Sequence, residues 1–172
     1  MNRRRERDAV DAILEQWAVE RPDVDVSAIG VIGRISRLEK MLAPELARVF
    51  ARHGLEAWQY DVLATLRRSG KPYELTVGAL LDSMMLASGT ITHRIDRLEQ
   101  RGLVERRSDP NDKRVVLVRL TTAGKRLVDA TIVDHAANET ELVSGLAPRE
   151  RAELEALLRR LHVSLSERST TG

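Results

Sequence analysis

Along most of this chain of 172 residues, apolar residues recur three and four positions apart, which is the period of amphipathic helices. In the first such segment the apolar stripe consists of Val10, Ile13, Leu14 and Trp17. Stop signals such as His53-Gly54 and Gly102 separate successive segments. The pattern predicts helices over residues 6–20, 27–52, 56–68, 77–84, 88–101, 122–142 and 147–166. Thr76 and Thr121 are the expected caps of the helices that begin at residues 77 and 122.

The period changes after Gly102. Residues 103–107 and 114–120 predict two strands, and the intervening Ser-Asp-Pro-Asn-Asp of 108–112 is typical of a turn. A helix, a short turn and a second helix over 76–101 directly precede this hairpin, which is the order of a winged helix. The expected fold is mainly α with a small β-hairpin wing: a winged helix-turn-helix flanked by N- and C-terminal dimerisation helices.

Composition narrows the class of protein. Hydrophobic residues make up 42% of the chain, which suffices for a core and argues against disorder. The absence of cysteine excludes disulfides and thiolate metal sites, and the four histidines show no close metal spacing. No apolar run approaches the roughly 18 residues of a membrane span. Since no signal peptide is visible after Met1 either, we expect a cytoplasmic protein without a membrane partner.

The charges are distributed unevenly. Residues 86–126 hold ten Lys or Arg against five Asp or Glu, whereas residues 127–172 hold five Arg against eight acidic residues. A basic middle beside an acidic end indicates one face that suits a polyanion. The arginines at 3, 4, 5 and 7 form either a phosphate-contacting arm or a solubilising tail.

This basic region carries the side chains that could contact DNA. An α-helix fits the major groove, and its outward side chains can reach base edges and phosphates. On helix 88–101 the expected core residues are Ile91, Ile95 and Leu98. The candidate DNA contacts on this helix are Ser88, Thr90, Thr92, His93 and Arg97. Lys113 and Arg114 at the hairpin tip could enter a narrow minor groove, where the negative potential favours arginine.

One run of residues resembles a known family. The segment 94–106, Arg-Ile-Asp-Arg-Leu-Glu-Gln-Arg-Gly-Leu-Val-Glu-Arg, is followed by Asp-Pro-Asn-Asp-Lys-Arg at 109–114 and by Leu120-Thr121. It resembles the recognition helix and wing of the MarR family of bacterial transcriptional regulators. The resemblance implies a homodimer on a pseudo-palindromic double-stranded DNA operator, usually a repressor released by a small ligand. It also implies that Arg114 enters the minor groove and that Asp112 holds it.

A narrower resemblance concerns the ligand. The chain is similar to a urate-binding subgroup of this family, which carries an extra N-terminal helix, at Trp17, Asp61, Arg94 and Arg106. The resemblance implies that these four residues bind urate, a flat anion that suits an indole and guanidinium groups. Asp61 could pair with an arginine in the empty protein, and the incoming anion would then disturb the recognition helix through Arg94. No cofactor or metal is implied.

Two alternatives stay open. The same DNA-binding dimer could respond to another small aromatic anion, phenolic or antibiotic-like, or the winged helix could serve protein contacts only. An enzyme is not expected, because the sequence lacks a Gly-rich phosphate loop and the usual nucleophile and zinc motifs. We expect one compact chain without an independent second domain. Residues 1–52 would form the extra helix and first dimerisation helix, 53–121 the DNA-binding domain and 122–172 the C-terminal dimerisation helices.

Overall fold

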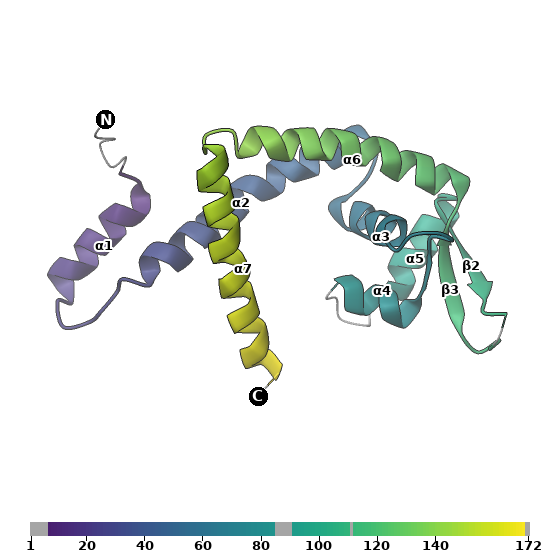
Figure 1. Cartoon of the computed structure of the whole chain (residues 1–172), viewed down its shortest axis with the longest axis horizontal. Coiled ribbons are helices and arrows are strands. Elements are labelled where there is room, and N and C mark those ends of the chain that lie inside the picture. The colour runs from purple at the N-terminus through teal and green to yellow at the C-terminus, as the bar shows by residue number, and fades with distance from the viewer. Residues whose placement is uncertain (1–6, 85–90, 111, 171–172) are drawn as a thin grey trace. The chain divides into compact units, whose positions relative to one another are not determined.

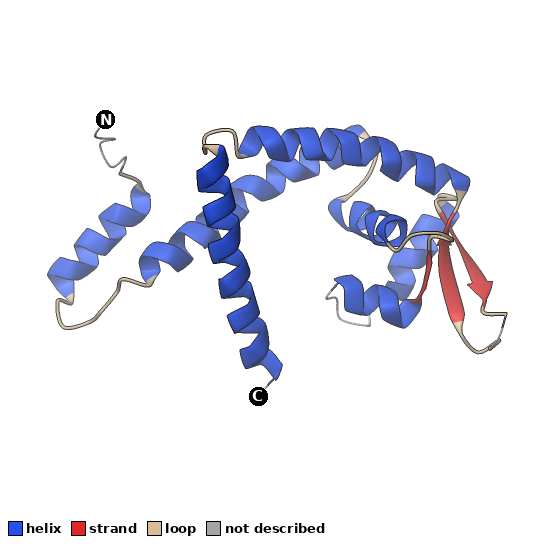
Figure 2. Ribbon diagram, in the orientation of Figure 1, coloured by secondary structure: helices blue, strands red, loops and turns tan. Residues whose placement is uncertain are grey.

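The computed structural model describes residues 7–84, 91–110 and 112–170 and consists of two compact units, Met1–Arg48 and Val49–Gly172. The helices are α1 (Ala9–Glu20), α2 (Ile29–Arg52), α3 (Ala57–Arg68), α4 (Val77–Met84), α5 (Ile91–Gln100), α6 (Thr122–Leu142) and α7 (Pro148–Thr170) (Figure 1). The strands are β1 (Glu74–Thr76), β2 (Val104–Ser108) and β3 (Val116–Leu120), drawn red in Figure 2. The expected fold class is confirmed.

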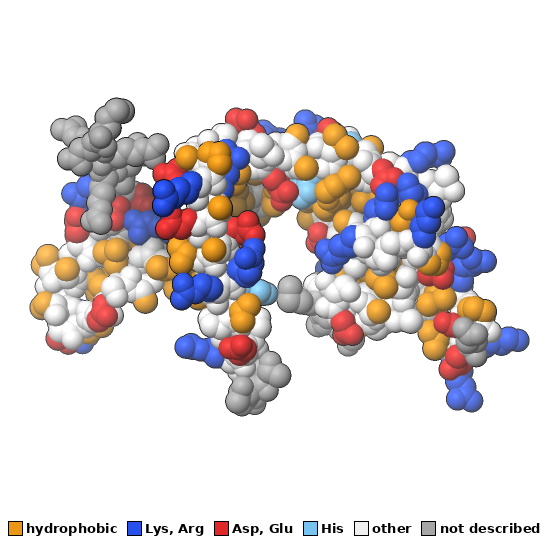
Figure 3. Space-filling model, in the orientation of Figure 1, with side chains coloured by type: hydrophobic (Ala, Val, Ile, Leu, Met, Phe, Trp, Pro, Cys, Tyr) orange, Lys and Arg blue, Asp and Glu red, His pale blue; other side chains and the backbone are white. Residues whose placement is uncertain are grey.

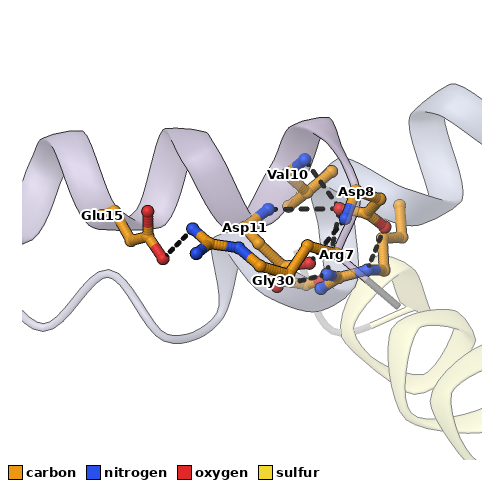
Figure 4. Close-up of polar contacts among 7 residues, drawn as sticks. Arg7, Asp8, Val10, Asp11, Glu15 and Gly30 are labelled. Atoms are coloured by element: carbon orange, nitrogen blue, oxygen red, sulfur yellow. Dashed lines mark hydrogen bonds and ion pairs between the residues drawn. The ribbon is translucent and has the colours of Figure 1, made fainter. Parts of the chain in front are cut away.

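In the first unit, α1 is tied to α2 through a cluster of charges (Figure 4). The carboxylate of Asp8 caps α1 by accepting the backbone N–H groups of Val10 and Asp11 at 2.7 and 3.1 Å. Arg34 of α2 donates to Asp8 and to Asp11, each at 2.8 Å. The helix therefore begins at Ala9, three residues later than the apolar pattern predicts, because the capping carboxylate sets its start.

Most of the apolar stripe of α2 is exposed. Among the described residues of this unit, Val10 alone is buried. The side chains that we call the apolar face of α2 are 36–67% exposed: Val31, Ile32, Ile35, Leu38, Met41 and Leu42. Trp17 at the end of α1 is 45% exposed. The predicted stripe thus forms, but within the single chain little covers it.

The second unit has a closed core. Residues from α3, α4, α5 and the sheet are no more than 2% exposed: Leu63, Leu66, Leu80, Ile91, Ile95, Leu98, Val104 and Val118. The three apolar residues that the sequence assigns to the core face of α5 are among them. Burial of one such side chain is worth about 1.5–3 kcal/mol relative to exposure. This core fixes α5 against the sheet.

The wing sheet has one more strand than the sequence predicts. Three antiparallel strands lie in the order β1-β3-β2, with Leu75 of β1 opposite Val118 of β3. At three residues β1 is too short to show alternation, so the hairpin alone is recognisable from the sequence. Strand β3 begins at Val116, because Val115 donates its backbone N–H to the carbonyl oxygen of Asp112 and so stays in the loop.

Helix α6 is held close to the wing at its first turn. Thr121 caps it as expected, accepting the N–H of Gly124 at 3.0 Å. A Cβ at Gly124 would lie 2.0 Å from the carbonyl oxygen of Leu103, so glycine is needed here. The last helix, α7, runs to Thr170, past the expected end at residue 166, and leaves Leu154, Leu157 and Leu158 42–54% exposed. In the described part of the chain, no helix is long and apolar enough to cross a bilayer.

Candidate functional site

Helix α5 presents polar side chains on the side opposite its core residues. Thr92 and His93 are exposed, and Arg97 is 46% exposed, as predicted for groove-facing residues. Arg97 also donates from Nη2 to Oε1 of Glu56, at the start of α3, at 2.8 Å. Ser88 and Thr90, the other predicted contacts before and at the start of this helix, lie outside the described residues.

The tip of the wing carries the predicted pair of cations. Lys113 and Arg114 are both exposed, and Lys and Arg side chains project at this end of the molecule in Figure 3. The carboxylate of Asp112 accepts the backbone N–H of Arg114 at 2.9 Å, which shapes the tip behind the arginine. The carboxylate of Asp109 accepts the N–H of Asp112 at 3.3 Å from within the same loop. These acidic residues therefore support the loop backbone.

Arg106 connects the wing to α5. From β2 its Nη1 donates to Glu99 at 2.5 Å and its Nη2 donates to Asp96 at 2.6 Å. Nη2 also lies 3.3 Å from the carbonyl oxygen of Thr92, and the backbone N–H of Arg106 donates to Glu99 at 2.9 Å. Partial burial opposes its charge, but the hydrogen bonds to the two carboxylates prevail and raise the pKa of Arg106. The guanidinium thus holds helix and wing together.

A cavity of about 570 Å³ lies among α3, α4 and α6 in the same unit. Its lining includes Asp61, Arg68, Met84, His135 and Glu139. His135 packs against Tyr60, with ring centroids 5.0 Å apart, and its buried Nδ1 has no hydrogen-bond partner among the described residues. A buried polar atom without a partner is uncommon in a folded protein, and this one belongs to a residue of the cavity wall.

Asp61 lies in the wall of this cavity. Its surface is accessible to solvent, but the surrounding protein atoms raise the pKa of its carboxyl group. The positive charges of Arg94, Arg68 and His135 act in the opposite direction and favour the carboxylate. Arg94 lies over the ring of Trp58, with its Cζ 5.5 Å from the centroid. Asp61 and Arg94 are therefore within electrostatic range across the space between α3 and α5.

The four residues assigned to urate occupy different surroundings. Asp61 lines the cavity, and the positive charge of Arg94 on α5 favours the carboxylate form of Asp61. Arg106 is engaged by Asp96 and Glu99 and is not part of the described cavity lining. Trp17 belongs to α1 in the other unit. The structure thus brings two of the four together.

Sequence reasoning missed two side chains at this site. Trp58 lies three residues before Asp61 on α3, and the guanidinium of Arg94 lies over its ring. His135 of α6 contributes to the cavity wall. The position of Trp58 one helical turn from Asp61 was visible in the sequence, whereas nothing local marked His135.

Comparisons with known proteins agree with this geometry. The model of the MarR family matches residues 55–116. The transcriptional regulator PecS of Dickeya dadantii is 38% identical over 156 residues, which cover 91% of this chain and 94% of PecS. The structure of a mutant MarR of Escherichia coli complexed with operator DNA is 30% identical, with a TM-score of 0.69, and covers 80% of this chain and 99% of that one.

A further similar structure concerns a ligand. The structure of Bordetella bronchiseptica BpsR, described as regulated in its DNA binding by 6-hydroxynicotinic acid, is 27% identical. It has a TM-score of 0.66 and covers 76% of this chain and 92% of BpsR. The helix-turn-helix, the basic wing and the extent of these similarities lead to one conclusion. The chain belongs to the MarR family and is a DNA-binding transcriptional regulator, not an enzyme.

Proposed function

We propose that this chain represses transcription as a homodimer on a pseudo-palindromic operator and that urate, or a closely related purine, releases it from DNA. Thr92, His93 and Arg97, with Ser88 and Thr90, would face the major groove. Lys113 and Arg114 would enter the minor groove, with Asp112 behind them. The operator-bound homologue from E. coli supports this arrangement and disfavours a winged helix used for protein contacts only.

The dimer is supported by unburied apolar surface. On an ordinary surface, exposed apolar side chains are scattered singly. On α2 they follow one another along one face of the helix, and exposed leucines likewise gather on α7. A second copy of the chain is the occupant that a two-fold-symmetric operator requires. The flanking helices would then supply the interface.

One observation carries the effector proposal: Asp61 lines a cavity, and the positive charge of Arg94 on the recognition helix favours the carboxylate form of Asp61 and lowers its pKa against the effect of burial. A urate anion near Asp61 would compete for the charge of Arg94 or repel the carboxylate. Either effect would disturb α5, from which the groove-facing side chains project.

If Arg106 binds the ligand, it must give up contacts that it makes in the free protein. Its guanidinium already binds Asp96 and Glu99, so an anion that took it would have to replace at least one carboxylate. Such an exchange would loosen the wing from α5 and would favour release of DNA. A second candidate is a small aromatic acid other than a purine, which the ligand described for BpsR supports.

The test is a titration of the protein bound to a duplex that carries the intergenic region upstream of its own gene. Urate, xanthine, salicylate and 6-hydroxynicotinate are added in parallel, and bound DNA is measured by mobility shift. Release by urate where the two carboxylic acids have no effect supports the proposal. Release by those acids alone supports the second candidate, and binding that no compound reverses discards both effectors.

Asp61→Asn sharpens the test. The substitution removes the negative charge that acts on Arg94 while preserving size, so the urate concentration that releases DNA should change by at least about tenfold. Asp82→Asn, which changes an exposed carboxylate on α4, is the matched control and should respond as the unmodified protein does. An unchanged response of Asp61→Asn would remove Asp61 from the site.

A further inference from the structure

The start of α3 contacts three arginines of the DNA-reading helix. The Cζ atoms of Arg94 and Arg97 lie 5.5 and 5.2 Å from the ring centroid of Trp58. Directly after the end of α5, Arg101 donates from Nη1 to Oε1 of Gln59 at 2.9 Å. These positions are three and four residues apart, so the arginines follow one side of the helix.

A second contact reinforces the first. Trp58 donates its Nε1–H to Oε2 of Glu56 at 2.8 Å, and the other carboxylate oxygen of Glu56 accepts from Arg97 at 2.8 Å. The hydrogen bond from Trp58 is the main cause that lowers the pKa of Glu56, so this carboxylate stays charged. Gln59 joins the group by accepting the backbone N–H of Glu56 at 2.9 Å. Indole, carboxylate and guanidinium therefore form a connected set.

This arrangement leaves the arginines able to bind DNA. A guanidinium that lies over an aromatic ring uses its face, and the N–H donors on its edges stay available. Arg97 uses one Nη for Glu56 and keeps further donors for a phosphate or a base. An arginine that is already oriented loses less side-chain freedom when it binds.

We propose that Trp58 is a positioning residue for DNA recognition: its ring holds Arg94 and Arg97 of α5 in the orientation in which they meet the DNA. The indole itself does not contact DNA in this proposal. Its effect on affinity passes through the two arginines. The proposal concerns DNA binding and is independent of the identity of the effector.

The first experiment measures the Kd for the same duplex over a range of salt concentrations with Trp58→Leu and Trp58→Phe. Loss of two exposed cation–π contacts should weaken binding by Trp58→Leu about fivefold to tenfold. Because the phosphate contacts are still made, the slope of log Kd against log salt should stay unchanged. Arg97→Ala, in contrast, should reduce the slope by about 0.9 if Arg97 reaches a phosphate.

Trp58→Phe keeps a smaller aromatic face and loses the Nε1–H, so it should bind within about twofold of the unmodified protein. This comparison separates positioning from a general loss of fold, and thermal unfolding of each variant monitors folding. Trp58→Met replaces the leucine variant if that one does not fold. Binding by the leucine or methionine variant that equals or exceeds that of the unmodified protein would overturn the proposal, as would equal losses for phenylalanine and leucine.

A double-mutant cycle provides the second experiment. If Trp58 acts through Arg97, then the combined Trp58→Leu/Arg97→Ala variant should lose less affinity than the product of the two single losses. The same cycle with Arg94→Ala tests the other arginine. Losses that multiply without coupling in both cycles would contradict a role for Trp58 through these arginines.

Discussion

Residues 7–48 and the winged-helix unit hold their helices together by different means. In the winged-helix unit, leucine, isoleucine and valine side chains from helices and strands are fully buried, and the ion pairs of Arg106 add to a finished core. In the N-terminal unit, Arg34 of α2 binds two aspartates at the start of α1 and Val10 packs near Gly33 of α2, while the apolar face of α2 is open. The winged-helix unit therefore has a core of its own, whereas the N-terminal unit relies on charge pairs and leaves its apolar face open to a partner surface.

The largest effect is expected at Gly124. Replacement by alanine places a Cβ 2.0 Å from the carbonyl oxygen of Leu103, and because that atom is backbone, the wing or α6 must shift. We expect a loss of about 4 kcal/mol in the free energy of unfolding, measured by urea denaturation. Gly145→Ala is the control, since no atom lies within 4 Å of its Cβ position. Equal stability of the two variants would contradict the close contact.

Alanine substitution of one leucine in each unit tests the difference between a closed core and an open apolar face. Leu63 of α3 is 0% exposed, so Leu63→Ala should cost about 3 kcal/mol at any protein concentration. Leu38 of α2 is 50% exposed in the single chain, so Leu38→Ala should leave the core intact and weaken association of two copies. Thermal unfolding and sedimentation over a range of concentrations distinguish the effects. If Leu38→Ala leaves the association unchanged, the apolar face of α2 is not the dimer surface.

The smallest effect concerns the attachment of α1. Hydrogen bonds from Arg34 are the main cause that lowers the pKa of Asp8, and the Asp8 backbone and Arg34 lower the pKa of Asp11. Depressed carboxyl pKa values stabilise the folded form above the ordinary carboxyl range, and this contribution disappears as pH falls through the depressed values. In a Trp58→Phe background, emission from Trp17 should therefore change below about pH 4.

Arg34→Ala should produce the same change of emission at neutral pH and remove its pH dependence. Arg37→Ala, on the same helix, is the control and should retain the transition of the parent protein. High salt should weaken the attachment as well, because the pairs are exposed. An acid transition that persists in Arg34→Ala would show that other groups hold α1.

Local signals predicted most of the fold. The caps at Thr76 and Thr121, the stop at Gly54 with its positive φ, and the core stripe of α5 each depend on neighbouring residues and were recognisable. Strand β1 was missed because Glu74–Thr76 forms a strand only through its pairing with β3. The exposure of the α2 stripe could not be inferred, because a periodic pattern shows which side is apolar and not what covers it.

The site was predictable to a smaller extent. The exposed side chains of α5 and the wing tip follow from helical period and turn chemistry. The contact of Trp58 with Arg97 joins residues that are 39 positions apart, and it exists only because α3 and α5 pack together. Likewise, the partners of Arg106 depend on how β2 lies along α5. The family resemblance assigned a ligand role to Arg106, whereas its geometry adds a structural one.

In the proposed mode of DNA binding, the Arg106 contacts would also limit which half-sites the protein can recognise. Because one side chain binds α5 at both Asp96 and Glu99, it fixes α5 to the wing. The spacing between a side chain of α5 in the major groove and the arginine at the wing tip would then be constant. A half-site would have to present its two grooves at that spacing, so the width and helical twist of the intervening base pairs would become part of the recognised sequence.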